Sequence, residues 1–195
     1  MSTPQSSPFR AQIRESTATL AALADQVPVL TAIADCLASC LEAGGTLYLC
    51  GNGGSAADAQ PVAAEFVGRF LRERRPLPAV ALTCNTSILT AIGNDYEFAE
   101  IFARQVRAHV APRDCVIGIS TSGRSPNVLR ALTAAREVGA ATIGFTGANG
   151  RELAGLCDVC LLVPSTSTPR IQEAHLLAWH LVSDEVERRA RASEA

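Results

Sequence analysis

The strongest constraint on the fold is a series of five short apolar runs, separated by longer segments with helical periodicity. The runs are apolar along their whole length and do not alternate with polar residues, a pattern typical of strands that are buried on both faces of a parallel sheet. The alternation of strands and helices predicts an α/β fold: an open parallel five-stranded sheet flanked by helices in three Rossmann-like layers. The runs span residues 46–50, 79–82, 114–119, 141–145 and 159–163.

Two apolar-periodic stretches precede the first run, with Pro28 at their junction and Gly44-Gly45 as a helix stop signal. They predict helices over residues 9–24 and 28–43. No low-complexity linker interrupts the chain, so we expect one domain over residues 1–195, with N-terminal helices in 1–44 and an α/β core in 45–195. The remaining helices are expected at residues 56–70, 88–94, 97–111, 127–138, 151–156 and 169–192.

Charge and hydropathy exclude several classes of partner. The formal net charge is -2 and no basic block is present, which argues against nucleic acid. The segment Met1–Pro8 is polar and lacks the apolar stretch of a secretory signal. No run approaches the ~18 apolar residues of a membrane span. The sequence therefore predicts a cytoplasmic protein with no membrane partner.

The seven cysteines agree with this location, because an odd number in mostly apolar surroundings is typical of reduced thiols. Cys157 and Cys160 form a C-x-x-C at the start of an apolar run. No second such pair and no histidine pair accompanies them. We interpret them as core thiols and not as a redox or zinc site.

The first apolar run ends in a glycine loop, residues 51–55, which reads Gly-Asn-Gly-Gly-Ser. Glycines let the backbone approach a ligand, and the helix that follows adds unpaired N–H donors. Ala56 occupies the third glycine position of a dinucleotide fingerprint, and no acidic residue follows the second run. A dinucleotide enzyme is therefore disfavoured, and we expect no nucleotide cofactor.

The third run ends in a hydroxyl loop, residues 120–125, which reads Ser-Thr-Ser-Gly-Arg-Ser. Four hydroxyls at a strand end, just before a helix, can donate to the oxygens of a phosphate group. The alternative is an ordinary helix N-cap, but a cap needs only one such side chain. The sequence therefore favours a phosphate site.

Five segments together resemble the sugar isomerase (SIS) domain family, and within it the phosphoheptose isomerases. The resemblance implies an aldose–ketose isomerase that converts sedoheptulose 7-phosphate to a manno-heptose 7-phosphate through an enediol. It also implies a homotetramer with active sites at subunit interfaces. The segments that carry it are residues 51–60, 64–70, 90–96, 119–123 and 170–173.

The resemblance assigns roles position by position. Two residues match groups at the reacting carbons: Glu65, the candidate base, and His180, the candidate acid. The expected substrate-binding residues are Asn52, Gly53, Gly54, Ser55, Glu65, Asn94, Asp95, Ser120, Thr121, Ser122, Ser125 and Gln172. In some members of the family Glu65, Gln172 and His180 also match zinc ligands. Either Arg124 or Arg170 is expected to supply positive charge near the phosphate, and His175 to be structural or a contact with a neighbouring subunit.

One position departs from the family pattern, because Pro61 stands where a histidine is expected, four residues before Glu65. Proline cannot bind a metal and cannot sit freely inside a helix. A helix that begins near Asp58 would place Pro61 among its first, unpaired N–H positions. Zinc therefore remains an open expectation. The alternative function is a non-catalytic SIS relative that acts as a phosphosugar sensor or a protein-interaction scaffold.

Overall fold

The computed structural model describes residues 7–192, and it builds them around a five-stranded sheet with the strand order β2-β1-β3-β4-β5. Every neighbouring pair of strands is parallel. The strands are β1 (Leu47–Gly51), β2 (Ala79–Ala81), β3 (Cys115–Ser120), β4 (Ala141–Gly147) and β5 (Val159–Val163). The predicted α/β class and the five parallel strands are confirmed.

Helices join and cover the strands, and their positions follow the sequence prediction closely. Two predicted helices divide: the stretch 9–24 into α1 and a 3-10 turn from Ala22, and the stretch 97–111 into a 3-10 turn and a short helix. The helices are α1 (Pro8–Ala21), η1 (Ala22–Gln26), α2 (Val27–Glu42), α3 (Gly54–Val67), α4 (Thr86–Asp95), η2 (Phe98–Glu100), α5 (Ala103–His109), α6 (Pro126–Val138), α7 (Arg151–Ala154) and α8 (Thr168–Ala192).

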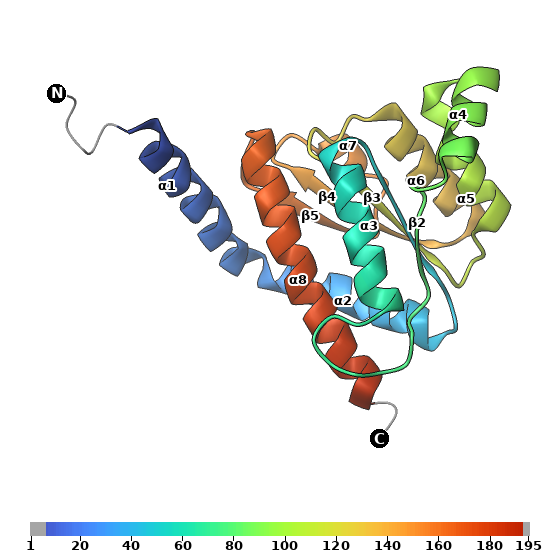
Figure 1. Ribbon diagram of the computed structural model, residues 1–195, viewed down its shortest axis with the longest axis horizontal. Coiled ribbons are helices and arrows are strands. Elements are labelled where there is room, and N and C mark those ends of the chain that lie inside the picture. Colours follow the sequence, from blue (N-terminus) through green and yellow to red (C-terminus); the bar gives the residue numbers. More distant parts are fainter. Residues whose placement is uncertain (1–6, 193–195) are drawn as a thin grey trace.

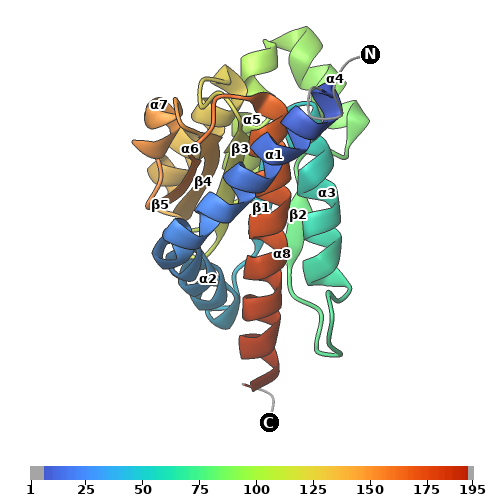
Figure 2. The ribbon, with the colours of Figure 1, turned by 90° about the vertical axis from the view of Figure 1, so that its left-hand side faces the viewer.

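The sheet separates two apolar cores. Along β1, Leu47 and Leu49 belong to the core under α2, α3 and α8, while Tyr48 and Cys50 belong to the core under α5 and α6. Successive side chains of a strand point to opposite faces, so a fully apolar strand serves both cores at once. Figures 1 and 2 show the resulting layers, with α3 and α8 side by side on one face.

The N-terminal helices differ in how they attach to this body. α1 projects from it (Figure 1), whereas α2 buries a full face that includes Ile33 and Leu37. The stretch Pro8–Glu42 is long and apolar enough, by length and composition only, to cross a membrane, with a hydropathy of 1.5. This differs from the sequence expectation. Because the α2 half of the stretch packs into the sheet core, the structure uses it as a core helix.

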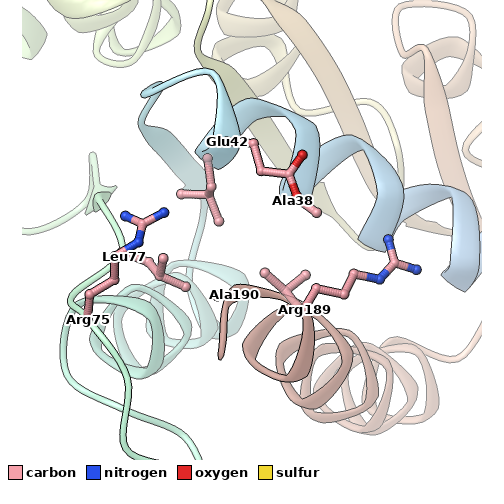
Figure 3. A pocket seen from close by; sticks show the side chains of 8 residues that line it. Ala38, Glu42, Arg75, Leu77, Arg189 and Ala190 are labelled. Carbon is pink, nitrogen blue, oxygen red and sulfur yellow. The ribbon is translucent and has the colours of Figure 1, made fainter. Parts of the chain in front are cut away.

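A small pocket lies at the opposite end of the sheet from the carboxyl ends of the strands, between the end of α2 and the end of α8 (Figure 3). Its volume of about 10 Å³ holds one water at most. Arg189, on its rim, already pairs with Asp35 at 2.6 Å. We therefore look for the functional site at the other end of the sheet.

Candidate active site

The glycine loop closes tightly over the end of β1. Gly53 has a φ of 54°, which favours glycine, and α3 begins at the next residue. A Cβ on Gly54 would lie 2.1 Å from Nε2 of Gln172, so only glycine lets α8 bring that amide so close. The expected glycine-loop residues and Gln172 thus meet at one place, at the carboxyl end of the sheet.

An amide pair fixes the same loop from the other side. Nδ2 of Asn52 donates to Oδ1 of Asn127 at 2.8 Å, and Nδ2 of Asn127 returns a bond of the same length to Oδ1 of Asn52. Asn127 is only 1% exposed, so this pair lies in a largely dry setting where both amides need partners. The sequence analysis missed Asn127, because an asparagine after a helix-opening proline gives no distinct signal. Ser55, expected to bind substrate, is buried at the start of α3.

The hydroxyl loop is organised around Ser120, whose Oγ lies 2.9 Å from Oγ of Ser125 and 3.5 Å from Oγ of Ser122. Ser125 occupies the N-cap position of α6 but makes no side-chain capping bond. The simple capping alternative therefore does not describe this residue. The hydroxyls of Ser120, Ser122 and Ser125 therefore gather just before α6, an arrangement that can donate hydrogen bonds to an anion.

Neighbouring turns hold the hydroxyl loop in place. The N–H of Gly147, at the end of β4, donates to the carbonyl of Thr121 at 3.1 Å. Gly123 has a φ of 66° and lies against Gly150, where a Cβ would meet backbone at 2.3 Å. A cavity lined by Thr121, Ser122 and Arg124 opens between these turns and the residues before α8.

A second group of candidate residues lies further along α3 and α8, where these two helices pack together. We call it the helix seam: Glu65, Phe70, His180 and Ser183. Oε1 of Glu65 lies 3.7 Å from Nε2 of His180, and Oγ of Ser183 donates to Oε2 of Glu65 at 2.9 Å. The Glu65 side chain is 18% exposed and the His180 side chain 44%. The predicted base and acid are therefore neighbours, and both reach the surface.

Within one chain the two groups are far apart. Eleven residues of α3 separate Gly54 from Glu65, which is about 16 Å along a helix. Eight residues of α8 separate Gln172 from His180, which is about 12 Å. A single chain therefore does not place Gln172 beside the Glu65–His180 pair, although the resemblance matches all three to one set of zinc ligands.

The predicted sugar-contacting pair, Asn94 and Asp95, ends α4 on the exposed side of the molecule. Nδ2 of Asn94 donates to Oδ1 of Asp95 at 2.8 Å. Among residues 7–192, no hydrogen bond links this pair to the hydroxyl loop or to the helix seam.

Pro61 lies in the middle of α3, so the expectation that the helix starts near Asp58 is wrong. α3 begins at Gly54, and Pro61 is its eighth residue. At this position proline leaves the carbonyl of Ala57 without its usual helical donor. The ring of Pro61 is exposed, and the helix continues past it to Val67.

The donors that one chain offers do not fit a zinc ion. Protein zinc sites use four ligands, or three ligands and a water, from cysteine, histidine and carboxylate groups. Among residues 7–192, no group of three such side chains is placed to hold a metal ion. Pro61 offers no donor, and Gln172 lies two helical turns from His180. Glu65 and His180 alone remain.

The remaining basic residues have separate positions. Arg170 is buried and donates to the carbonyl of Gln12 on α1 at 3.0 Å, so it anchors α1. Of the two arginines expected near the phosphate, Arg124 is the one that is exposed beside the hydroxyl loop. His175 is fully buried, and Nε2 lies 3.3 Å from the carbonyl of Thr146. Burial lowers the pKa of His175 to about 4, so its imidazole is neutral near pH 7. This agrees with the expectation that His175 is a structural residue.

Three partly buried side chains take no part in the contacts described above: Asp58, Cys157 and Cys160. The Asp58 carboxyl, on α3 above Pro61, has one buried oxygen without a hydrogen-bond partner, and burial raises its pKa. Cys157 and Cys160 are both partly buried free thiols whose sulfurs lie against Gly144. The hydrogen bond between the two thiols, and then burial, raises the pKa of Cys157, so this thiol stays protonated.

Sequence and structure comparisons place this arrangement in a known class. The model of the SIS domain matches residues 11–147. The chain therefore belongs to the SIS domain family. Curated relatives that are 50–58% identical to this chain share one name, phosphoheptose isomerase. This chain is 54% identical to a phosphoheptose isomerase of Rhodospirillum rubrum over 165 residues, which is 85% of this chain and 88% of the relative.

Other relatives agree. A phosphoheptose isomerase of Roseiflexus is 58% identical over 163 residues, covering 84% of this chain and 83% of the relative. Among solved structures, the phosphoheptose isomerase of Neisseria gonorrhoeae has a TM-score of 0.87 at 42% identity and covers 92% of this chain and 97% of its own. That of Francisella tularensis has a TM-score of 0.89 at 36% identity and covers 92% and 96%.

Proposed function

We propose that this protein is a phosphoheptose isomerase, an aldose–ketose isomerase that converts sedoheptulose 7-phosphate to a manno-heptose 7-phosphate. One observation carries the proposal: a carboxylate and an imidazole, Glu65 and His180, lie 3.7 Å apart and both reach the surface. Isomerisation needs a base at carbon and an acid at oxygen, and these are the groups that proteins use for both tasks. Relatives that are more than half identical to this chain over the aligned residues bear the same name.

The proton transfers follow from this pair. The Glu65 carboxylate takes the proton from the carbon next to the carbonyl, while His180 acts as the acid and donates a proton to the carbonyl oxygen, which gives the enediol. The resulting enediol then receives the proton from Glu65 on the neighbouring carbon, and His180 moves a proton between the two oxygens. Ser183 holds Oε2 of Glu65, which leaves Oε1 for the substrate.

The phosphate group belongs at the hydroxyl loop. Ser120, Thr121, Ser122 and Ser125 donate to its oxygens, and the positive end of the α6 dipole lies directly after them. Arg124 is exposed beside the loop and supplies compensating charge. An anchored phosphate fixes the sugar relative to the base, which removes much of the entropic cost of reaction.

We infer further that the working form is a homotetramer with active sites between subunits. The distance of about 16 Å from the glycine loop to Glu65 along α3 exceeds the length of an extended heptose phosphate. We infer that a sugar held at the glycine loop of one chain meets the Glu65–His180 pair of another copy. Val67 on α3 and Leu176 on α8 also expose apolar side chains, which a second chain would cover.

Two finer points complete the proposal. The composition and the free thiols support a cytoplasmic enzyme. Zinc enters none of the proton transfers derived above, since the donors of one chain do not converge. Subunits that share a site could bring Gln172 of one copy to the Glu65–His180 pair of another, and zinc titration tests that arrangement.

The deciding experiment is turnover of sedoheptulose 7-phosphate, followed by NMR, with and without added zinc. An aldoheptose phosphate product is the expected result. Binding of the sugar phosphate without turnover would contradict the isomerase and favour the sensor or scaffold alternative. Neither of these needs a carboxylate–imidazole pair, and for that reason the structure does not favour them.

A further inference from the structure

One buried carboxylate holds the loop that follows α3, residues 68–78. The Glu187 side chain is 1% exposed and accepts three backbone N–H bonds, from Phe70, Leu71 and Arg72, each at 2.8 Å. Three consecutive donors on one carboxylate leave the start of this loop little freedom. The loop has no regular secondary structure of its own, so its position depends on α8.

Arg74 ties the same loop to α3. Its Nε lies 3.5 Å from Oε1 of Glu187, and its guanidinium donates to the carbonyls of Glu65 at 2.6 Å and Gly68 at 3.0 Å. Burial alone would raise the pKa of Glu187, but the backbone donors and Arg74 lower it below its usual value. Glu187 therefore stays charged at neutral pH and keeps all of these contacts.

The loop places an aromatic ring on the candidate acid. The rings of Phe70 and His180 are stacked, with centroids 5.5 Å apart and planes 24° from parallel. The His180 side chain is 44% exposed, so only part of its surroundings is protein. An exposed imidazole on a helix samples several rotamers, and a stacked ring removes that freedom.

We propose that Phe70, held in place by Glu187 through the 68–78 loop, positions the His180 imidazole for proton transfer. This inference rests on the proposed isomerase function and adds two positioning residues to it. Neither contacts the substrate in this scheme. The loop contacts fix Phe70, Phe70 fixes the ring of His180, and the ring then keeps Nε2 toward Glu65 and the sugar.

The consequence is a specific split between kcat and KM. The phosphate is anchored at the hydroxyl loop, which shares no contact with Phe70, so loss of the ring leaves KM nearly unchanged. Misplacement of a catalytic group by even a small distance costs about 10- to 100-fold in rate. We therefore expect Phe70→Leu to lower kcat by about that factor, whereas Phe70→Tyr keeps the ring and the rate.

The test combines kinetics with NMR of chelator-treated protein. The stack should shift the ring protons of His180 upfield, and the His180→Gln variant identifies these signals among the three histidines. Phe70→Leu should lose the shift, and Phe70→Tyr should keep it. Leu71→Ala is the matched control, because Leu71 is the next residue of the loop and is 63% exposed. Glu187→Gln should weaken the shift and lower kcat in parallel.

Several outcomes would overturn the inference. Unshifted His180 protons in the wild type would mean that the rings do not stack in solution. An unchanged kcat in a folded Phe70→Leu variant would contradict the positioning role and leave the isomerase function intact. A wild type that turns over no sugar phosphate would contradict the isomerase function, and the positioning role with it. If Phe70→Leu does not fold, Phe70→Met replaces it, since methionine keeps the apolar volume without the ring.

Discussion

The hydroxyl loop and the helix seam are built on different length scales. The hydroxyl loop is local: Ser120 contacts Ser122 and Ser125, a few residues away along the chain. The helix seam is long-range: the Ser183–Glu65 hydrogen bond joins residues 118 positions apart. The loop can therefore be specified by a short motif, whereas the seam exists only after α8 has packed on α3. Changes in the loop should act on substrate binding, and changes in the seam on the chemical step.

The largest expected effect tests the seam. Glu65→Gln keeps the shape of the side chain and removes the base, so kcat should fall by about 10³-fold with little change in KM. Progress curves followed by NMR at several substrate concentrations separate the two constants. Glu73→Gln, on the exposed loop nearby, is the control and should leave both unchanged. A large rise in KM with an unchanged kcat would assign Glu65 to binding and remove the contrast with the loop.

The next effect concerns His175, which joins α8 of the seam to the end of β4. Burial lowers its pKa to about 4 from 6.5, so in acid the unfolded chain binds a proton that the native state does not. The free energy of unfolding should therefore fall as the pH drops from about 6.5 towards 4, by up to about 3 kcal/mol from this residue. Above pH 7 this loss is absent.

Chemical denaturation at a series of pH values measures the His175 effect. The His175→Leu variant should lose stability less steeply in acid than the wild type, while His109→Gln, a change at an exposed histidine on α5, should follow the wild type. An acid dependence that is identical with and without His175 would show that other groups cause it.

A smaller effect tests the hydroxyl loop. Ser125→Ala removes one hydroxyl from the proposed phosphate site, and a hydrogen bond to a charged group contributes about 2 kcal/mol. We expect KM for the sugar phosphate to rise about 30-fold while kcat stays within a few-fold. Thr31→Ala, an exposed hydroxyl change on α2, is the control. A fall in kcat at constant KM would mean that the hydroxyl loop acts on the chemical step, and the contrast with the helix seam would be lost.

The smallest effect concerns Pro61. Alanine at this position restores the N–H donor for the carbonyl of Ala57, so Pro61→Ala should raise the free energy of unfolding by about 1 kcal/mol. Gln60→Ala, one residue earlier on the exposed side of α3, should change it by less than that. Urea denaturation compares the two. No gain from Pro61→Ala would show that α3 has adjusted fully to proline.

The sequence predicts the sheet and the loop better than the seam, for physical reasons. Fully apolar runs identify buried parallel strands, and four hydroxyls at a strand end identify an anion site, because both signals lie within a few neighbouring residues. Asn127 pairs with Asn52 across 75 positions, and periodicity carries no trace of that contact. Glu187 looks like any charged residue near a helix end until the fold buries it. A start of α3 near Asp58, the alternative that would have accommodated Pro61, is wrong, because α3 tolerates proline as its eighth residue.

The strand order has a consequence for the folding of this protein during its synthesis. β1 lies between β2 and β3, and the N–H of Thr46 at its start bonds to Asp114, 68 positions later. While the chain leaves the ribosome, β1 has β2 as its one early neighbour and waits for β3 before the sheet can grow. α8 emerges last, and with it His180 and Ser183. During synthesis, most of the sheet and the hydroxyl loop can therefore form well before His180, the candidate acid, is available to pair with Glu65.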